Sequence, residues 1–269
     1  MLRLSYFGTT TIPVEAECVT PDNLAGKTSS EIEKLLVHNG NVAVPLAEFF
    51  RVEGDASDET ILVTGDTTRV KLLGAGMTRG RLTIEGSAGM HVGAEMTGGE
   101  IQVLGNVSDW VGAEMAGGRI HVHGNAGHLA GAGYRGSRLG MRGGTLLIRG
   151  TSGNEIGSHM RRGLIAVGGC QDYPGVSMIA GSIFVFGPAG IRPGAGMKRG
   201  TVLFANAEPP MLPSFRLAGT FELVFLTLYM RQLRDWGYPV PDEMLNARWK
   251  RYCGDLVALG KGEILTRVA

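Results

Sequence analysis

Residues 93–105 read GAEMTGGEIQVLG, and residues 112–124 repeat the pattern as GAEMAGGRIHVHG. The same unit recurs along the middle of the chain, where successive copies of its methionine are separated by 19, 19, 26, 19, 18 and 19 residues. These methionines are Met77, Met96, Met115, Met141, Met160, Met178 and Met197. A fixed period of this length is typical of a solenoid whose repeats stack on one another.

Each unit predicts a short β-strand between glycine corners. Apolar residues stand five and seven positions after the methionine, as Ile101 and Val103 do after Met96, and polar residues alternate with them. This period of two is the pattern of a strand with one buried face. Each of the 43 glycines would cost roughly 0.5–1 kcal/mol inside a helix, which excludes a helical repeat. The sequence therefore predicts an all-β protein, a parallel β-helix of about seven 19-residue turns with the methionines stacked inside.

The region before the repeats predicts a small α+β cap over residues 1–60. Ser30 and Glu33 have the spacing of a capping box that opens a short helix. Asn39-Gly40 lies between two apolar runs and predicts a hairpin, while residues 46–52 fit either a second short helix or a strand. The glycine-rich solenoid is expected to fill residues 61–206.

Residues 207–269 are expected to form a C-terminal extension, because the prolines at 209, 210 and 213 interrupt a strand ladder. An amphipathic helix is predicted there from apolar residues at helical spacing. These are Phe221, Val224, Phe225, Leu228 and Tyr229. Such a helix packs on the open edge of the solenoid, which is the preferred interpretation, or on a partner protein.

Composition limits the classes of function. The net charge of +1 and the lack of a long apolar stretch predict neither nucleic acid nor membrane as a partner. Three cysteines without a CxxC motif, and a start without a signal peptide, indicate a cytoplasmic protein. Residues 1–73 hold 6 Lys or Arg against 11 Asp or Glu, so the cap is acidic and the basic surplus lies in the rest of the chain.

The 26-residue step marks an insertion before Met141, in the segment GAGYRGSRLG over residues 131–140. Insertions in a solenoid become loops on one side, which is frequently the binding side. Tyr134, Arg135, Ser137 and Arg138 offer hydroxyl and guanidinium groups that suit a carboxylate or a phosphate. A solvated basic loop, or a contact with another subunit, remains an equal alternative.

A basic ladder follows the methionines. Its members in the later repeats are Arg142, Arg161, Arg162, Lys198 and Arg199, and Arg79 holds the same place in the first repeat. Stacking would bring Arg142 and Arg161 to about 5 Å, where like charges repel unless an anion lies between them. A linear polyanion along the coil axis would fit this ladder, and so would an acidic neighbouring subunit, including the acidic cap of this chain.

Other candidate sites are weaker. His121, His123 and His128, with Glu95 or Glu114, could supply metal ligands, but a structural role for them is the simpler interpretation. The aspartates and serines form no recognisable nucleophile, acid or base constellation. The sequence therefore predicts no catalytic residue and no metal site.

The repeated G-A-x-M-x-x-G-x-[LIV]-x-[LIV]-x-G unit resembles the family of formylmethanofuran dehydrogenase C subunits, which includes the C subunit of the bacterial formyltransferase/hydrolase complex. Further likeness lies in residues 131–141, in MRRGLI at 160–165, in PGAGMKRG at 193–200 and in LPSF at 212–215. The resemblance extends over nearly the whole chain. The glycine pattern alone is also similar, more distantly, to the β-helix of glutamate synthase large subunits.

The resemblance implies a non-catalytic subunit of a complex that handles one-carbon units on a methanofuran-type carrier. It implies partners of amidohydrolase-like, formyltransferase and dehydrogenase-B-like kinds, with the metal centres outside this chain and no cofactor bound by it alone. The carrier of this family bears a polyglutamate arm, which the basic ladder and the inserted loop could hold.

Three alternatives remain open. The bacterial complex, which serves tetrahydromethanopterin-linked formaldehyde oxidation, is favoured over the archaeal molybdenum or tungsten formylmethanofuran dehydrogenase by residues 131–140 and 160–165. A stand-alone β-helix enzyme, either a lyase or a transferase, is a rival of another class. An acyltransferase would repeat every six residues, and a lyase would expose clustered aspartates. A purely architectural subunit without ligand contact is the third.

Overall fold

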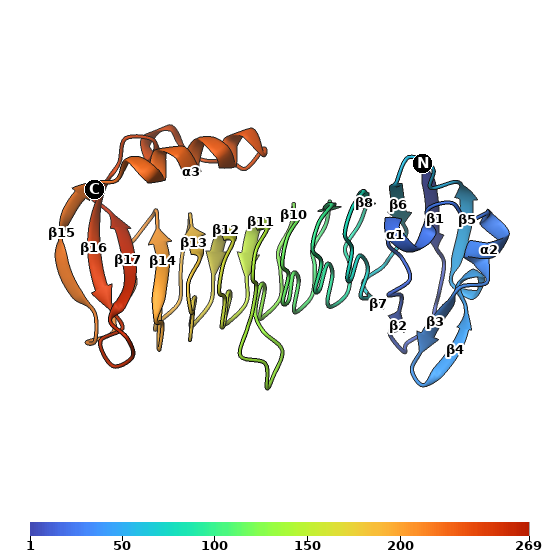
Figure 1. Cartoon of the computed structure of the whole chain (residues 1–269), viewed down its shortest axis with the longest axis horizontal. Helices are drawn as coiled ribbons and strands as arrows, with labels where there is room; N and C mark the ends of the chain where they lie inside the picture. Colours follow the sequence, from blue (N-terminus) through green and yellow to red (C-terminus); the bar gives the residue numbers. More distant parts are fainter. Residues whose placement is uncertain (269) are drawn as a thin grey trace.

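Most of the chain forms strands stacked along one axis, as Figure 1 shows for the computed structural model, which describes residues 1–268. The chain is mostly β, as the repeat predicts. One strand of each repeat pairs in parallel with its neighbours, so that Leu82, Ile101 and Ile120 stand side by side. These strands are β6 (Thr60–Thr64), β8 (Arg81–Ile84), β9 (Glu100–Val103), β10 (Arg119–Val122), β11 (Thr145–Ser152), β12 (Leu164–Cys170), β13 (Ser182–Val185) and β14 (Arg199–Phe204).

The core of the stack contains the repeated methionines, all of which are fully buried, as predicted. Each methionine except Met141, which follows the inserted loop, comes after a corner in which every second residue is left-handed, for example His91, Gly93 and Glu95 at φ of 64°, 63° and 58°. Gly93 is required there because a side chain would collide with Ile120 and Ile101. Glycine corners therefore let one turn lie directly over the next.

Polar side chains link the turns at the opposite corner. The carboxylate of Asp109 accepts a hydrogen bond from the backbone nitrogen of His128 at 2.7 Å, and Nδ1 of His128 accepts one from the nitrogen of Asn154 at 2.9 Å. Asn154 Oδ1 and Asp172 Oδ1 continue the series to the nitrogens of Asp172 and Ile191. Each side chain thus satisfies a backbone donor of the following turn.

The N-terminal region adds strands to the stack and forms a second sheet. β1 (Leu2–Tyr6) lies between β6, to which it is parallel, and β5 (Phe50–Gly54), to which it is antiparallel. The second sheet has the strand order β4-β3-β2-β7. Its strands are β2 (Val14–Glu15), β3 (Leu36–Asn39), β4 (Val42–Pro45) and β7 (Val70–Lys71); the short helices are α1 (Pro21–Leu24), α2 (Ser29–Glu33) and the 3₁₀ turn η1 (Leu46–Glu48).

Local expectations in this region are partly confirmed. β3 and β4 form the hairpin predicted around Asn39-Gly40. The prediction of a capping box at Ser30 and Glu33 is wrong. Thr28 is the N-cap of α2, and Glu31 is its partner in the capping box. The same spacing fits both pairs, and Thr28 is the residue with extended backbone that a cap needs. Residues 46–52 contain both a 3₁₀ turn and the start of β5.

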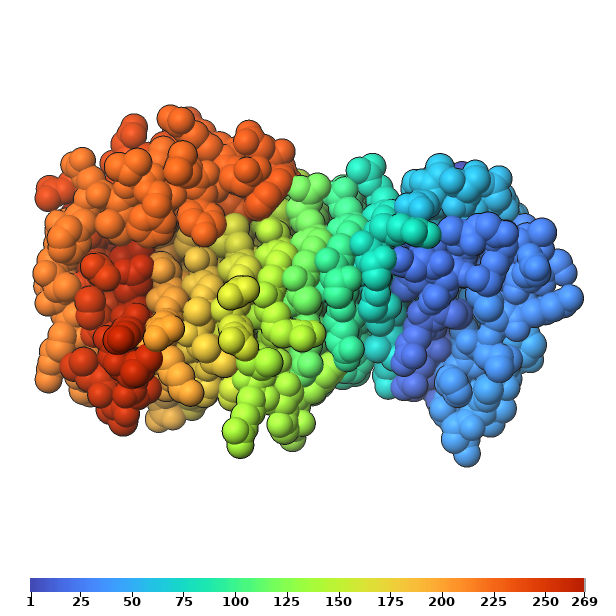
Figure 2. Space-filling model, in the orientation of Figure 1, coloured from blue at the N-terminus to red at the C-terminus, as the bar shows by residue number. Residues whose placement is uncertain are grey.

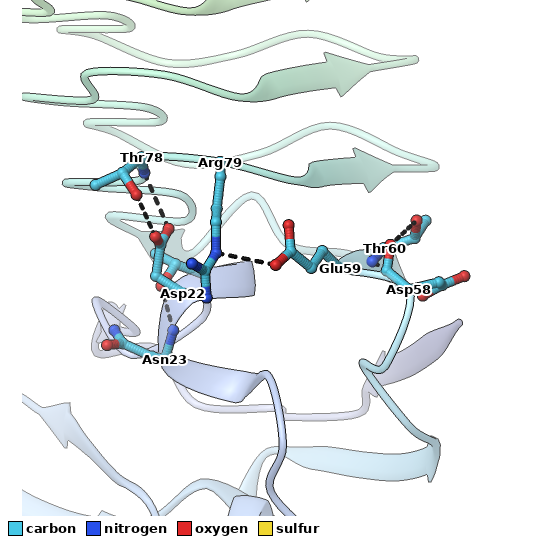
Figure 3. Close-up of polar contacts among 8 residues, drawn as sticks. Asp22, Asn23, Asp58, Glu59, Thr60, Thr78 and Arg79 are labelled. Carbon is cyan, nitrogen blue, oxygen red and sulfur yellow. Dashed lines mark hydrogen bonds and ion pairs between the residues drawn. The ribbon is translucent and has the colours of Figure 1, made fainter.

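The cap is joined to the first turn of the stack by carboxylates (Figure 3). Asp22 of α1 accepts a hydrogen bond from the backbone nitrogen of Thr78 at 2.9 Å and another from the Thr78 hydroxyl. Arg79 forms an ion pair with Glu59 at 3.0 Å. The acidic cap therefore neutralises the first basic residue of the ladder within the same chain.

The C-terminal region closes the other end with strands. β17 (Lys261–Arg267) pairs in parallel with β14, and β16 (Arg248–Gly254) and β15 (Arg216–Glu222) follow in antiparallel order. α3 (Val224–Asp235) lies along the outer face of the last turns in Figure 1, and the 3₁₀ turn η2 (Asp242–Met244) follows it. The sequence favours a helix packed on the open edge of the stack. That prediction is wrong, because β17, β16 and β15 cover this edge and α3 lies on the outer face.

The buried face of α3 also differs from the predicted face. Leu226, Met230 and Leu233 pack onto the stack, whereas Val224 and Leu228 are 78% and 63% exposed. The cause lies in the strands below, whose outward positions are apolar in the last turns and make a second core with the helix. These outward residues are Leu147, Ala166, Phe184, Leu203 and Leu265.

Candidate functional site

The basic ladder follows the methionines on one edge of the stack. The backbone nitrogens of Arg142, Arg161 and Lys198 donate to the carbonyl oxygens of Met115, Met141 and Met178 in the preceding turns. Ile179 holds the same place between Arg161 and Lys198, since its nitrogen donates to Met160. The structure thus brings Arg142 and Arg161 together on adjacent turns, as the repeat predicts, and leaves one uncharged turn before Lys198.

A second column runs beside the first. The strand pairs Leu164–Ser182 and Ser182–Thr201, continued two residues toward the N-terminus, bring Arg162 level with Ala180 and Ala180 level with Arg199. Between Arg79 of the first repeat and Arg162, this column holds only glycines, because a Cβ at Gly98, Gly117 or Gly143 would collide with a backbone carbonyl oxygen of the preceding turn. Backbone packing therefore confines the dense part of the ladder to the C-terminal half of the stack.

Charge on this edge is exposed and uncompensated. Arg142, Arg161, Arg162, Lys198 and Arg199 are all exposed. Within residues 1–268 none of the five forms an ion pair, in contrast to Arg79. We call these five residues the basic edge. It can bind an anionic group by charge and by guanidinium hydrogen bonds.

The inserted loop, residues 133–140, projects from the stack as the yellow-green protrusion in Figure 2, and the chain continues from it directly into Met141 and Arg142. Its two ends are held by hydrogen bonds to the next turn, from the nitrogen of Gly133 to the oxygen of Ser158 and from the nitrogen of Gly140 to the oxygen of His159. Arg135 and Arg138 are exposed at its tip. The loop therefore presents two guanidinium groups from a fixed base.

The Tyr134 side chain does not join Arg135 and Arg138 at the tip of the loop; it packs against His91 of an earlier turn. Its hydroxyl lies 3.1 Å from Nδ1 of His91, and its ring lies 5.5 Å from the His91 ring. Burial, with Glu95 and Glu114 nearby, raises the pKa of Tyr134 to about 12. The ring lines a cavity of about 580 Å³ between the loop and the hairpin of β3 and β4, together with Glu15, Glu17 and Glu95. The structure thus separates Tyr134 from the predicted anion-binding arginines.

The candidate metal ligands have structural partners. The rings of His121 and His123 stack at 4.4 Å, and Nε of Arg149 donates to Nε2 of His121 at 3.2 Å. Burial first, and then the positive groups around it, lowers the pKa of His121 to about 4. His128 lies at another corner in the polar series described above. In the described part of the chain, no group of three His, Cys, Asp or Glu side chains is arranged to hold a metal ion.

The repeats and the end regions both have counterparts in known proteins. The GXGXG motif family matches residues 67–212. The C subunit of the formyltransferase/hydrolase complex Fhc from Methylorubrum extorquens is 39% identical over 246 residues, 91% of this chain and 92% of that protein. The chain belongs to the family of formylmethanofuran dehydrogenase C subunits.

Archaeal members of this family match over a shorter segment. The C subunit of the molybdenum-containing formylmethanofuran dehydrogenase 1 of Methanosarcina barkeri is 47% identical over 85 residues, 30% of this chain and 28% of that protein. The C subunit of the tungsten-containing enzyme 2 of Methanothermobacter thermautotrophicus is 38% identical, again over 30% of this chain and 32% of that protein. The chain therefore spans about a third or less of these archaeal relatives.

A solved structure from this family has the same fold over its full length. A chain in the crystal structure of the FhcABCD complex of Methylorubrum extorquens with methylofuran is 32% identical, with a TM-score of 0.92. The match covers 99% of this chain and 100% of that chain. Both end regions of the present structure are thus shared with that protein, and not only the glycine-rich repeats.

Proposed function

We propose that this chain is the C subunit of a formyltransferase/hydrolase complex in tetrahydromethanopterin-linked one-carbon metabolism, and that it acts as a scaffold without a catalytic centre of its own. The observation that supports this most strongly is the likeness over 99% of the chain to a member of the FhcABCD complex. Neither the basic edge nor the histidine pair supplies a nucleophile with an adjacent base, which agrees with a supporting role.

The proposed architecture divides the chain into three parts. Residues 61–206 form a parallel β-helix, residues 1–60 close one end, and residues 207–269 close the other. Parallel registers from β6 to β14 and the buried methionine column support the coil. The start of the parallel ladder at β6, whose first residue is Thr60, supports the division at residue 60. A rigid coil of this kind offers an extended surface to several partners at once.

The proposed partners are amidohydrolase-like, formyltransferase and dehydrogenase-B-like subunits. The matched crystal structure is that of the FhcABCD complex. Support within this chain comes from the outer face of α3, where Val224, Phe225 and Leu228 are 78%, 40% and 63% exposed. A contiguous apolar face on a protein surface is typical of a contact with another protein.

We place the chain in the cytoplasm, where its unpaired cysteines Cys18, Cys170 and Cys253 would remain reduced. In the part that the structure describes, no helix is long and apolar enough to cross a membrane.

The carrier of the complex is proposed to be of the methanofuran type, bound by the complex and contacted by this chain through its anionic arm. The matched complex contains methylofuran. Exposure and uncompensated charge at Arg142, Arg161, Arg162, Lys198 and Arg199 support such a contact. Arg135 and Arg138 of the inserted loop extend the same positive surface, while Tyr134 supports the base of the loop through His91.

The archaeal redox complex is the second candidate, and the 47% identity to a protein of the molybdenum enzyme favours it locally. That identity covers 30% of this chain, whereas the bacterial relative matches 91% of it. Because the bacterial relative matches the N-terminal and C-terminal regions as well as the repeats, the comparison supports the bacterial type.

Reconstitution tests the proposal. The other three subunits should be expressed from one host with and without this chain, and formate release from formylated carrier should be measured. We expect a stable assembly of all four subunits and full hydrolysis only when this chain is present. Equal assembly and activity without it would refute the scaffold function.

A further inference from the structure

The main sheet has two edge strands, and the chain itself covers one of them. β5 forms one edge, and α2 packs against it, with the hydroxyl of Ser29 donating to the carbonyl oxygen of Gly54 at 3.1 Å. β15 forms the other edge, and among residues 1–268 no element lies beyond it in Figure 1. Six of its seven residues are exposed. The C-terminal end of the sheet is therefore open to another molecule.

The backbone of β15 has unused hydrogen-bonding groups. In the described part of the chain, the strand pairs with β16 on one side, and no other backbone hydrogen bond reaches residues 216–222. Because successive residues of an antiparallel strand bond to alternate sides, about three residues direct their N–H and C=O groups away from β16. The strand is about 23 Å long, at about 3.3 Å per residue. A row of unpaired groups of this length is matched by a second extended chain.

An apolar pocket lies at the end of this strand. It is formed by the last residue of β15, the first turn of α3, the segment after η2 and Trp249 of β16, and its volume is about 270 Å³. Leu226, Met244, Leu245 and Ala247 supply apolar walls. At about 30 Å³ per water molecule, the pocket has room for about nine non-hydrogen atoms, which is enough for a Leu, Met or Phe side chain.

The ends of β15 carry opposite charges. Arg216 begins the strand and Glu222 ends it; both are exposed, and within residues 1–268 neither forms an ion pair. Opposite charges across a strand pair are favourable. A partner strand is therefore complementary when it carries a carboxylate opposite Arg216 and a basic group opposite Glu222.

A second copy of β15 fits this edge poorly. The register pairs Arg216 with Cys253 and Glu222 with Arg248, and these two partners are five residues apart on β16. Side chains an odd number of residues apart point to opposite faces, so the bulge at Ala218 leaves Arg216 and Glu222 on opposite faces of the sheet. Directly opposite residues of an antiparallel pair share a face. Two copies therefore could not pair the arginine of one with the glutamate of the other.

We infer that β15 is a docking edge for an extended segment of another subunit, which adds a strand to the main sheet and places a large apolar side chain in the pocket beside Trp249. This rests on the proposed assembly of the chain into a complex, and it names the mode of contact. Strand addition derives its affinity from main-chain hydrogen bonds and its specificity from pockets for side chains. β15 and its pocket offer both.

Hydrogen exchange followed by mass spectrometry tests the docking edge on the full chain alone and on the purified four-subunit complex. In the free chain, we expect about three amides of residues 216–222 to exchange within seconds. In the complex, the same amides should exchange at least about 100-fold more slowly, because the added strand pairs with them.

A pair of variants tests the pocket. Ala247→Phe fills it with a side chain of this chain, so we expect the affinity for the other three subunits to fall about tenfold or more, with the unfolding midpoint within a few degrees of that of the unchanged protein. Ala258→Phe is the matched control, because Ala258 is exposed in the loop at the other end of β16. If Ala247→Phe does not fold, the exchange comparison on the unchanged chain decides.

Three results would overturn the docking edge. The first is fast exchange of residues 216–222 in the intact complex, and the second is equal affinity of Ala247→Phe and Ala258→Phe for the other subunits. The third is slow exchange of these residues in a dimer of the free chain, which would make a second copy the occupant. A complex that forms with β15 still exposed would refute the docking edge alone, whereas failure of the unchanged chain to assemble would refute the scaffold function as well.

Discussion

The backbone nitrogen of Arg161 donates a hydrogen bond to the carbonyl oxygen of Met141 at 2.8 Å. Since Arg142 follows Met141 in the chain, this bond fixes the two guanidinium-bearing residues on adjacent turns, about 4.8 Å apart in the backbone. The methionine column inside the stack thus sets the spacing of the charges outside it. An arrangement that keeps like charges together costs free energy, which a bound anion would recover.

Reversing the charge of Arg161 and Arg162 should abolish most of the anion binding by the basic edge. In the double variant Arg161→Glu with Arg162→Glu, we expect affinity for a six-residue oligoglutamate or for the polyglutamylated carrier to fall at least about tenfold, because two attractions become repulsions. Isothermal titration calorimetry measures the affinity. Lys34→Glu with Arg51→Glu, two exposed cations in the N-terminal region, is the control. Unchanged affinity in the first variant would remove the basic edge as a binding site.

Asp22 should hold the cap onto the first turn. Asp22→Ala leaves the backbone nitrogen of Thr78 without its partner, so we expect a loss of about 1–2 kcal/mol in the free energy of unfolding in urea. Asp235→Ala, at the exposed end of α3, should change it by less than about 0.5 kcal/mol. If the two variants were equally stable, the cap would be held by other contacts.

The same carboxylate should make the cap sensitive to acid. Partial burial raises the pKa of Asp22, but the hydrogen bonds from Thr78 outweigh burial and leave the pKa below its ordinary value. Its contribution is therefore complete above the unfolded pKa of about 3.9 and is lost as the pH falls through the folded value. The stability difference between the protein and Asp22→Ala should accordingly shrink below about pH 4.

His121 should give a separate pH dependence at higher pH. Its folded pKa of about 4 lies below the unfolded value of about 6.5, so the unfolded chain binds a proton that the folded chain does not. Stability from this residue is complete above about pH 6.5 and declines, by roughly 1–3 kcal/mol, as the pH falls to about 4. In His121→Gln, the free energy of unfolding in urea should vary less with pH over this range than it does in the unchanged protein. His38→Gln is the control, because His38 is exposed on β3 and its replacement should leave this pH dependence unchanged. An equal slope in both variants would contradict the burial argument.

The outer face of α3 should be needed for assembly and not for folding. Val224→Glu with Leu228→Glu changes two exposed residues, so we expect the unfolding midpoint to stay within a few degrees while the other subunits fail to bind in size-exclusion chromatography. Leu226→Glu is the contrasting variant, since Leu226 is buried against the stack and its replacement should unfold the helix. Normal assembly of the double variant would show that partners bind elsewhere.

The ladder of parallel strands could be predicted from the sequence because each repeat contains the residues that define its own strand and corner. Met96, Gly99, Ile101 and Val103 are enough to define one turn, and the next turn needs only the same residues. The two ends lack this redundancy. β17 depends on a register with β14 that no local pattern encodes, so Lys261 could not be placed beside Arg199 before the structure.

The sequence of the strands already indicated where α3 packs, although the prediction for the helix missed it. Leu147, Phe184 and Leu203 are apolar at positions where earlier turns carry Thr83 and Gln102, which marks a covered outer face on the last turns. The helix itself is apolar on two sides, so its own spacing cannot tell which side packs. For the site, the ladder follows from the repeat, whereas the separation of Tyr134 from Arg135 depends on its contact with His91, a residue 43 positions away.

The most direct test is the composition of the particle that contains this chain in its own cell. The chain should be affinity-tagged at its chromosomal locus, purified without crosslinking, and the intact particle weighed by native mass spectrometry with its subunits identified. We expect one stable particle that contains an amidohydrolase-like subunit and a formyltransferase subunit together with this chain. A monomer that carries a formyl-processing activity by itself would contradict the scaffold role.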